Sequence, residues 1–389
     1  MFSDTLLKLF NKKQTPFYYY DIEVLLNILN IVKSISSKNG YIIHYALKAN
    51  FNDKILRLIS KTGFGADCVS GNEVKKAIAT GFSADSIVFS GVGKSDEEIN
   101  ISLDNHISCF NVESIQELEV INDLAFKKNI VAPVALRINP DIASGTHKYI
   151  TTGKEENKFG VNPNDLEHII SLLLKLNNVQ LTGLHFHIGS QITDLNVFKK
   201  LCLRINEISD WFNNRNIEIK NINVGGGLGI NYEQPDKMIP DFENYFEVFN
   251  KYLNISKNQK LHFEPGRSIV AHCGTLISRV LYIKKGLNTD FVILDAGLTE
   301  LIRPALYQSY HKIENISSNE SKTIKYNVVG PICESSDYFG KEVELKQSKR
   351  GDIIAIRLTG AYGEVMASVY NLRTKAKAYY SDETIKTSL

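Results

Sequence analysis

Short runs of apolar and β-branched residues alternate with amphipathic segments through the first two-thirds of the chain. Runs of this length, bounded by turn residues, are typical of buried strands. We count eight of them, at residues 41–46, 65–69, 87–90, 107–112, 134–138, 181–188, 222–224 and 261–263. The pattern therefore predicts a sheet whose strands are buried on both faces.

The segments between these runs carry apolar residues three and four positions apart, the spacing that lets a helix cover a sheet. They are residues 52–61, 71–80, 95–104, 113–127, 163–176, 195–212 and 240–253. Eight strand–helix alternations over about 240 residues match a TIM-type (β/α)8 barrel, which typically takes ~250 residues. A doubly wound sheet is the rival interpretation, but no G-x-G-x-x-G follows the first strand.

The pattern changes after about residue 265. Residues 274–282, 289–294, 323–329 and 352–358 are β-branched, with turns at Lys285-Gly286 and Arg350-Gly351. This predicts a C-terminal all-β domain, of Greek-key or β-barrel type, so the fold class is α/β plus β. Residues 17–20, before the first helix, are expected to pair with it. We thus predict a barrel over 21–265 and a β domain from 1–20 and 266–389.

Composition narrows the class of protein. Lys plus Arg is 45 and Asp plus Glu is 43, a net charge of +2, which argues against a nucleic-acid partner. No apolar stretch is long enough to cross a membrane, and no signal peptide is visible. The five cysteines, at 68, 109, 202, 273 and 333, form no paired spacing. We therefore expect a cytoplasmic protein without disulfides, membrane partner or metal.

The first candidate for chemistry is Lys48 in the segment YALKAN, at the C-terminal end of the first barrel strand. Barrel enzymes place their catalytic groups at this end. Flanking Ala46, Leu47 and Ala49 would partly desolvate the amine, which favours a neutral nucleophile toward carbonyls. A surface lysine whose stem covers apolar area is the alternative.

Two glycine-bearing turns follow strands seven and eight, where barrels often bind phosphate. They are GGGLG, residues 225–229, and EPGR, residues 264–267, whose Arg267 adds charge. HFHIGSQ ends strand six and contains His185, His187 and Ser190. Either histidine could stack on a planar ring or pack in the strand, and zinc binding lacks further ligands.

A nucleophilic lysine, a phosphate cradle and a stacking platform together indicate pyridoxal phosphate. In that interpretation the Glu264 carboxylate lies against the pyridine nitrogen and keeps it protonated, so that the ring accepts electrons from the substrate Cα.

Eight motifs, in order between about residues 15 and 375, resemble the fold-type III pyridoxal-phosphate decarboxylases, and among them the diaminopimelate decarboxylase family. They are YALKAN, GFGADCVSGNE, HFHIGSQ, NVGGGLG, EPGR, RPALY, GPICESSD and GAYG. Two positions depart from the family pattern: Asn72, where glycine is common, and Val369, where asparagine is common.

The resemblance implies a role for each candidate. Lys48 forms the internal aldimine and Cys333 donates the proton to Cα. Further cofactor contacts are implied for His187, Ser190, Gly226, Gly227, Glu264, Pro265, Gly266, Arg267 and Tyr362. Substrate contacts are implied for Arg267, Arg303, Tyr307, Glu334 and Tyr362. It also implies a homodimer in which Cys333 and Glu334 come from the partner chain.

Arg303 and Glu334 indicate the substrate. A guanidinium suits a distal carboxylate and a glutamate suits a distal ammonium, which together describe meso-2,6-diaminopimelate. The expected reaction is its decarboxylation to L-lysine. Both residues could instead be ordinary surface charges. The alternatives are a decarboxylase for arginine, carboxynorspermidine or a carrier-bound amino acid, a non-catalytic homologue, and, more distantly, a cofactor-free barrel aldolase.

Overall fold

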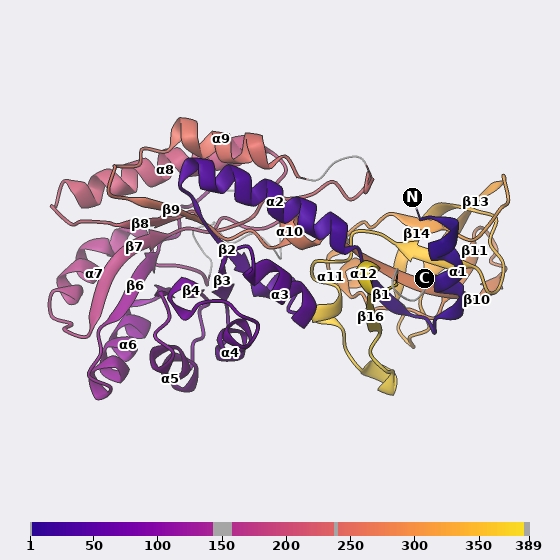
Figure 1. Ribbon diagram of the computed structural model, residues 1–389, viewed down its shortest axis with the longest axis horizontal. Coiled ribbons are helices and arrows are strands. Elements are labelled where there is room, and N and C mark those ends of the chain that lie inside the picture. The colour runs from indigo at the N-terminus through magenta and orange to yellow at the C-terminus, as the bar shows by residue number, and fades with distance from the viewer. Residues whose placement is uncertain (1, 143–157, 237–239, 385–389) are drawn as a thin grey trace. The chain divides into compact units, whose positions relative to one another are not determined.

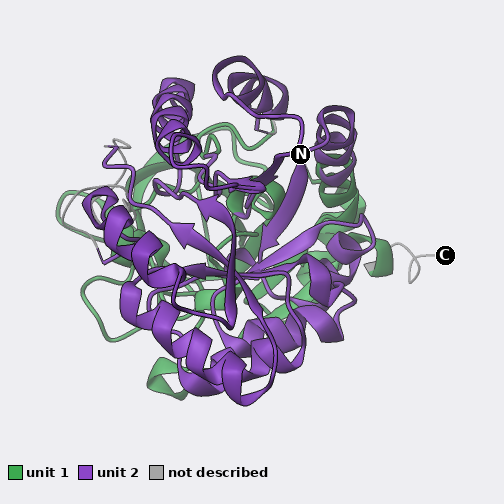
Figure 2. Cartoon of the chain, turned by 90° about the vertical axis from the view of Figure 1, so that its left-hand side faces the viewer, with its two compact units in different colours: residues 1–28, 230–239, 267–389 green, residues 29–229, 240–266 purple. Residues whose placement is uncertain are grey.

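The computed structural model describes residues 2–142, 158–236 and 240–384 of the chain. The chain forms two compact units, coloured separately in Figure 2. The barrel unit comprises residues 29–229 and 240–266, and the β unit comprises residues 1–28, 230–239 and 267–389. Each unit is therefore assembled from segments that are distant in the sequence.

Eight parallel strands close the barrel in the order β2 to β9, with β9 pairing back onto β2 (Figure 1). The strands are β2 (Ile42–Ala46), β3 (Gly65–Cys68), β4 (Ile87–Phe89), β5 (Cys109–Val112), β6 (Ala132–Arg137), β7 (Val179–His185), β8 (Asn221–Asn223) and β9 (Lys260–Phe263). The predicted barrel, with its eight strands, is confirmed.

One amphipathic helix precedes β2 and seven follow the strands β2 to β8, and they bury their apolar stripes. They are α2 (Ile22–Asn39), α3 (Asp53–Ser60), α4 (Gly71–Ala79), α5 (Asp96–Asp104), α6 (Ile115–Lys127), α7 (Leu166–Leu173), α8 (Leu195–Asn213) and α9 (Phe242–Tyr252). Short 3-10 turns lie at η1 (Leu47–Ala49), η2 (Ala84–Ser86) and η3 (Pro163–Asp165). Serine caps start several of these helices: Ser95 forms a capping box with Glu98 at α5, and Ser70 and Ser114 cap α4 and α6.

The β unit is built on an eight-stranded sheet. Its strands are β1 (Phe17–Tyr20), β10 (Gly274–Lys284), β11 (Asp290–Leu294), β12 (Ile313–Asn315), β13 (Thr323–Val329), β14 (Tyr338–Lys346), β15 (Ile353–Ile356) and β16 (Lys377–Tyr380). The path runs β12-β15-β10-β11-β13-β14, and β1 lies between β10 and β16. The expectation that residues 17–20 join this sheet is confirmed.

Helical segments of the β unit were not predicted from its β-rich pattern. They are α1 (Asp4–Lys12), α10 (Arg267–Val270), α11 (Arg303–Tyr307), α12 (Ser381–Thr384), η4 (Glu364–Met366) and η5 (Tyr370–Leu372). Ser3 caps α1, which buries Phe10 against Phe17, Tyr19 and Ile277 of the sheet. The helix is short, and its stability comes from this packing rather than from its own propensity.

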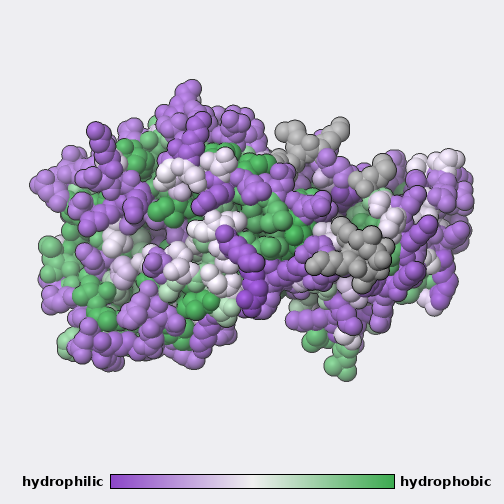
Figure 3. All heavy atoms as spheres, viewed as in Figure 1, coloured by the Kyte–Doolittle hydropathy of each residue, from purple (hydrophilic) through white to green (hydrophobic). Residues whose placement is uncertain are grey.

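The described part of the chain contains no helix that is long and apolar enough to cross a membrane. The face seen in Figure 3 is largely hydrophilic, with hydrophobic patches between the charged side chains. Such scattered patches are ordinary for a folded chain, because apolar atoms contribute more than half of most protein surfaces.

Candidate active site

Lys48 lies in η1, directly after β2, at the C-terminal end of the barrel. Its neighbours Leu47 and Ala49 are buried, as expected, but its side chain stays 37% exposed. The Lys48 Nζ lies 3.1 Å from Oδ2 of Asp67, which is fully buried at the end of β3. Burial and the Glu264 charge raise the pKa of Asp67, and the Lys48 charge opposes them. The amine therefore has a fixed carboxylate partner, which the sequence analysis did not foresee.

Glu264 follows β9 and is 5% exposed. Its Oε2 accepts a hydrogen bond from His185 Nε2 at 3.0 Å, and its Oε1 accepts from Asn223 Nδ2 at 2.7 Å. Burial alone would raise the pKa of Glu264, but the hydrogen bond and charge of His185, aided by Lys48, hold it well below its usual value. Glu264 is therefore a buried anion with a fixed orientation.

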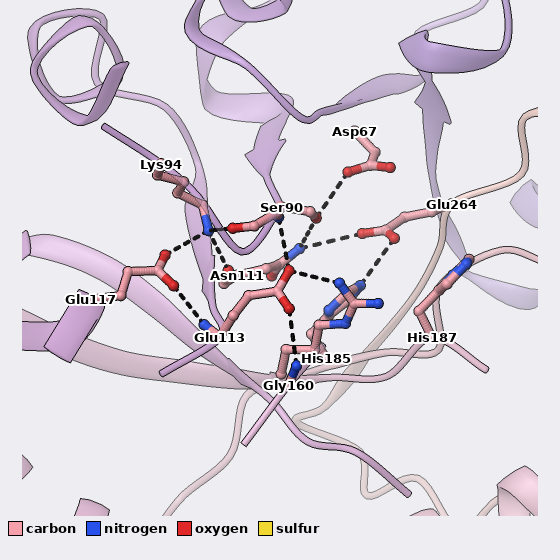
Figure 4. A network of polar contacts seen from close by, with 12 residues as sticks. Asp67, Ser90, Lys94, Asn111, Glu113, Glu117, Gly160, His185, His187 and Glu264 are labelled. Carbon is pink, nitrogen blue, oxygen red and sulfur yellow. Dashed lines mark hydrogen bonds and ion pairs between the residues drawn. The ribbon is translucent and has the colours of Figure 1, made fainter. Parts of the chain in front are cut away.

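A hydrogen-bonded chain connects Asp67 to Glu264 across the barrel (Figure 4). Ser90 Oγ donates to Asp67 Oδ1 at 2.9 Å and accepts from Asn111 Nδ2 at 2.9 Å. The second Asn111 N–H points to Glu264 Oε1 at 3.4 Å. Ser90 and Asn111 come from the ends of β4 and β5, so the chain crosses neighbouring strands. It ties the carboxylate beside Lys48 to the carboxylate after β9.

A second buried ionic network lies at the ends of the same strands (Figure 4). The Arg137 guanidinium, at the end of β6, lies 2.7 Å from Glu113 Oε1, and Lys94 Nζ lies 2.6 Å from Glu117 Oε1. Glu113 also accepts a hydrogen bond from the backbone N–H of Gly160 at 3.0 Å. These pairs hold the loops after β4, β5 and β6 at the barrel mouth.

His187 lies two residues beyond the end of β7 and is drawn beside Glu264 and His185 in Figure 4. Its Nδ1 accepts a hydrogen bond from the backbone N–H of Gly226 at 3.3 Å. Enclosure by protein atoms, with the nearby charges of Arg137 and Lys48, lowers the pKa of His187 well below its usual value. The imidazole is therefore neutral at physiological pH, and it is His185 that binds Glu264.

Glycines bring the loops after β7, β8 and β9 into close contact. The Glu264 N–H donates to Gly225 O at 2.8 Å, and the Ile192 N–H donates to Gly227 O at 2.9 Å. A Cβ atom at Gly226 would collide with the backbone oxygen of Glu264, and Gly227 has φ +108°, which favours glycine. These loops form a narrow glycine cradle, in which the Gly226 N–H donates to His187 Nδ1, and Ser190 lies in the first of the loops.

The remaining cofactor candidates of the EPGR segment lie on both sides of a unit boundary. Pro265 and Gly266 belong to the barrel unit, where the Pro265 carbonyl accepts from the Ala46 N–H at 3.2 Å. A Cβ at Gly266 would lie 3.0 Å from the Cβ of Ala49, beside Lys48. Arg267 starts α10 in the β unit.

Two buried arginines of the β unit form one cluster with aromatic side chains. Arg267 donates to Tyr232 OH at 2.6 Å, and its guanidinium lies 4.7 Å from the ring centre of Tyr362. Arg303, the first residue of α11, lies 4.9 Å from the ring centre of Tyr232. Tyr307, at the end of α11, is close enough to Arg267 for their charges to interact. The structure thus brings four predicted substrate residues together and adds Tyr232.

Cys333 and Glu334 lie elsewhere in the β unit, on an exposed loop between β13 and β14. Buried Asp337 shapes this loop by accepting hydrogen bonds from the backbone N–H groups of Ile332 and Leu298, at 2.8 and 2.6 Å. Glu334 accepts from Tyr370 OH at 2.9 Å. Among the described residues, the side chains that bind this pair are therefore Asn371 and Tyr370 rather than members of the arginine cluster.

Among the described residues, no group of three or more His, Cys, Asp and Glu side chains is arranged to hold a metal ion. The ionisable groups at the barrel mouth instead pair with one another. The arrangement offers an amine beside a carboxylate, a buried anion, a neutral imidazole and a glycine cradle. These are groups suited to an organic cofactor with a phosphate and a basic ring nitrogen.

Comparison with known proteins agrees with this donor set. Residues 28–271 match the family model described as pyridoxal-dependent decarboxylase, pyridoxal binding domain. The chain is 54% identical to a diaminopimelate decarboxylase of Bacteroides thetaiotaomicron, over 97% of this chain and 98% of that protein. It is 39% identical to the diaminopimelate decarboxylase of Neisseria meningitidis serogroup B, over 93% of this chain and 86% of that protein.

The fold of the chain also matches that of a solved structure. The crystal structure of diaminopimelate decarboxylase from Helicobacter pylori, complexed with L-lysine, superposes with a TM-score of 0.90 at 40% identity. The match covers 97% of this chain and 94% of that one. A lysine/ornithine decarboxylase from Vibrio vulnificus, 22% identical, shares the fold with a TM-score of 0.84.

Proposed function

The chain belongs to the pyridoxal-dependent decarboxylase family and, within it, to the diaminopimelate decarboxylases, and from this premise we propose its reaction and its site. It removes carbon dioxide from meso-2,6-diaminopimelate and releases L-lysine, which makes it a carboxy-lyase of lysine biosynthesis. The carboxylate is lost from the D-centre, so the L-centre passes unchanged into the product.

The cofactor is pyridoxal 5′-phosphate, and the barrel residues fit it. Glu264 is a buried anion, and a protonated ring nitrogen is the cation that would complement it. The glycine cradle around Gly226 and Gly227 suits a phosphate, because a side chain at either position would collide with the backbone of the facing loop. We assign Ser190, Pro265, Gly266, Arg267 and Tyr362 to the same site as further cofactor contacts.

When bound, the cofactor accepts the electron pair that remains at Cα after carbon dioxide leaves. Glu264 holds a proton at the ring nitrogen, because an ionised buried carboxylate favours a cation beside it. His187, being neutral, supplies a flat face without adding a competing charge. His185 and Asn223 fix the orientation of Glu264.

Lys48 and Cys333 carry the covalent and proton-transfer roles. Lys48 would hold the cofactor through its amine, and Asp67, 3.1 Å from Nζ, orients that amine. Cys333 donates the proton to Cα, which asks for a positioned thiol rather than a resting thiolate.

The observation that carries the choice of substrate is Arg303. It is 5% exposed, and its described partners are the neutral His311 and Tyr232, so its charge is available to a ligand. A buried cation of this kind suits the distal carboxylate of diaminopimelate and disfavours L-lysine as a substrate, because the distal end of that substrate carries only an ammonium group. Arg267, Tyr307 and Tyr362 complete this end of the site, and Glu334 binds the distal ammonium.

Replacing Arg303 tests this assignment. Losing a charged hydrogen-bond partner in a buried site costs about 1.5–3 kcal/mol, so Arg303→Ala should lower kcat/KM for diaminopimelate at least about tenfold. The preference for diaminopimelate over L-lysine as substrate should fall by the same factor. Arg350→Ala is the matched control, because Arg350 is an exposed arginine of the same unit. An unchanged preference in Arg303→Ala would contradict the assignment.

The protein acts as a homodimer with shared sites. Support comes from the exposed loop of Cys333 and Glu334 and from the apolar segment beside it. Val369, Tyr370 and Leu372 are 55%, 48% and 97% exposed, and Figure 3 shows hydrophobic atoms at the tip of the segment that Figure 1 draws in yellow. We propose that a second copy of the chain covers this segment and receives Cys333 in its own site.

We also assign a role to each domain and a location to the enzyme. The barrel, residues 21–265, binds the cofactor, and the β domain, residues 1–20 and 266–389, contributes substrate and interface residues. We place the enzyme in the cytoplasm, because all five cysteines are free thiols and the substrate is a small biosynthetic amino acid.

A further inference from the structure

Arg303 has a partner that no substrate contact explains. Its NH1 lies 2.6 Å from Nε2 of His311, which is eight residues further along the chain and 2% exposed. The His311 ring also packs edge-on against Tyr232, with ring centres 4.9 Å apart. Among the described residues, no carboxylate pairs with Arg303. Within the described parts of the chain, the guanidinium is therefore held by the imidazole of His311 and by Tyr232, both of which are uncharged partners.

The protonation of His311 follows from its two contacts. Its Nδ1 lies 2.9 Å from the backbone oxygen of Arg357, which can only accept, so Nδ1 carries the proton. Nε2 then presents a lone pair, and it accepts the hydrogen bond from Arg303. Burial and the adjacent arginine charges lower the pKa of His311 to about 3, so the ring does not gain a second proton at neutral pH.

The sheet of the β unit fixes the imidazole. His311 lies two residues before β12, and Arg357 follows β15, its pairing partner. The register Ile313↔Ile356 and the bond from Arg357 N to Lys312 O, 2.9 Å, hold the two segments together. The direction in which Arg303 points is thus set by a strand pair rather than by a flexible loop.

We propose that His311 is a positioning residue for substrate selection: it orients Arg303 as a neutral acceptor and so leaves the guanidinium charge for the distal carboxylate. The inference rests on the proposed function. An aspartate or glutamate at this place would also orient Arg303, but it would form an ion pair and cancel the charge that the substrate needs. Burial lowers the pKa of Arg303, yet the ordinary value is so high that the charge remains.

The experiment compares His311→Phe, His311→Gln and His311→Glu by calorimetric binding of L-lysine and of cadaverine to the holoenzyme. When L-lysine binds as the product, its ε-amine lies at the reacting position and its carboxylate is the distal one, whereas cadaverine has no carboxylate at either end. His311→Phe keeps the ring but loses both hydrogen bonds, so the Kd for L-lysine should rise about tenfold or more while that for cadaverine stays within about threefold. The glutamine variant restores an acceptor and should recover part of the loss. The glutamate variant should bind L-lysine more weakly than the phenylalanine variant does.

Kinetics add a second readout. In His311→Phe the KM for meso-diaminopimelate should rise about tenfold, with kcat changed much less, because the reacting carbon lies at the other end of the substrate. Asn315→Ala is the matched control: it removes a buried side chain of β12 that hydrogen-bonds Ser348 and Asp352 instead of Arg303. It should lower the midpoint of thermal unfolding without changing either Kd.

Two results would overturn the inference: equal weakening of L-lysine and cadaverine in His311→Phe, or a glutamate variant that binds L-lysine as the wild type does. Failure of the proposed function is a different result, namely a wild-type holoenzyme that does not release carbon dioxide from diaminopimelate. The binding comparison does not need turnover, so it decides the role of His311 in that case as well.

Discussion

Replacing Glu264 by glutamine should slow the reaction without dismantling the site. The two side chains have nearly the same shape, and Asn223 can still donate to the glutamine oxygen where it now donates to Oε1 at 2.7 Å. At the other oxygen, 3.0 Å from His185 Nε2, the new amide becomes a donor. His185 can keep a proton on Nδ1, which has no hydrogen-bond partner among the described residues, and accept the new amide N–H at a deprotonated Nε2. The hydrogen bonds therefore survive, and the charge is what is lost.

The loss of the Glu264 charge determines how far kcat falls. Removing one preorganised electrostatic partner from a buried site typically costs about 2.7–4 kcal/mol in the transition state. We therefore expect kcat for diaminopimelate to fall about 100- to 1000-fold, with bound pyridoxal phosphate per subunit close to that of the wild type. The assay is kcat at saturating substrate, with cofactor content measured by absorbance after release in alkali.

Glu117→Gln provides the matched control. Glu117 is also a buried carboxylate of the barrel, paired with Lys94, but it does not contact Glu264. Its loss should reduce stability and leave kcat within about fivefold. A Glu264→Gln enzyme with full cofactor content and a kcat within about threefold of the wild type would refute the role given to the buried anion.

Three further predictions concern other residues. Lys48→Ala should lose the visible absorbance of the lysine-bound cofactor together with activity, and a band that persists would place the cofactor lysine elsewhere. Mixing Lys48→Ala with Cys333→Ala subunits under exchange should give hybrid dimers with one intact site and up to about half of wild-type activity per dimer; no recovery despite proven exchange would contradict a shared site. Burial raises the pKa of Glu73 to about 7, above its unfolded value of about 4.3. The folded state therefore binds this proton up to a higher pH than the unfolded state does. As the pH rises from about 4.3 to about 7, the free energy of unfolding falls by at most about 1.4 kcal/mol per pH unit. In urea unfolding between pH 5 and 7.5, the free energy of unfolding should decline less for Glu73→Gln than for the wild type. Parallel declines in the two proteins would assign the pH dependence to other groups.

The sequence predicted the barrel because its strands and helices have distinct periods. Strand ends followed by Lys48, HFHIGSQ, GGGLG and EPGR also located the barrel mouth, since parallel strands bring their C-terminal ends to one face. The family and the cofactor class predicted from the eight motifs were confirmed by the comparisons. The individual residue roles remain predictions.

Other parts of the site depend on contacts that no local pattern encodes. Asp67, Ser90 and Asn111 each look like an ordinary polar residue in a strand, and their shared chain exists only once three strands align. The one signal in the sequence was the segment GFGAD, in which Asp67 follows Gly65 by two residues at a predicted barrel strand. The orientation of His311 could not be predicted from the sequence either, because its partner Arg357 is 46 residues away in the chain. The helix α1 was missed because its apolar face is completed by the sheet of the β unit.

Product analysis with a panel of amino acids shows whether the protein performs the proposed reaction. Purified protein with pyridoxal phosphate is incubated with meso-diaminopimelate, L-lysine, L-ornithine and L-arginine, and carbon dioxide and the amino-acid product are quantified together. The account predicts equal amounts of carbon dioxide and L-lysine from meso-diaminopimelate, and at least about tenfold slower release from each of the others. Faster release from lysine, ornithine or arginine, or none from diaminopimelate, would contradict it.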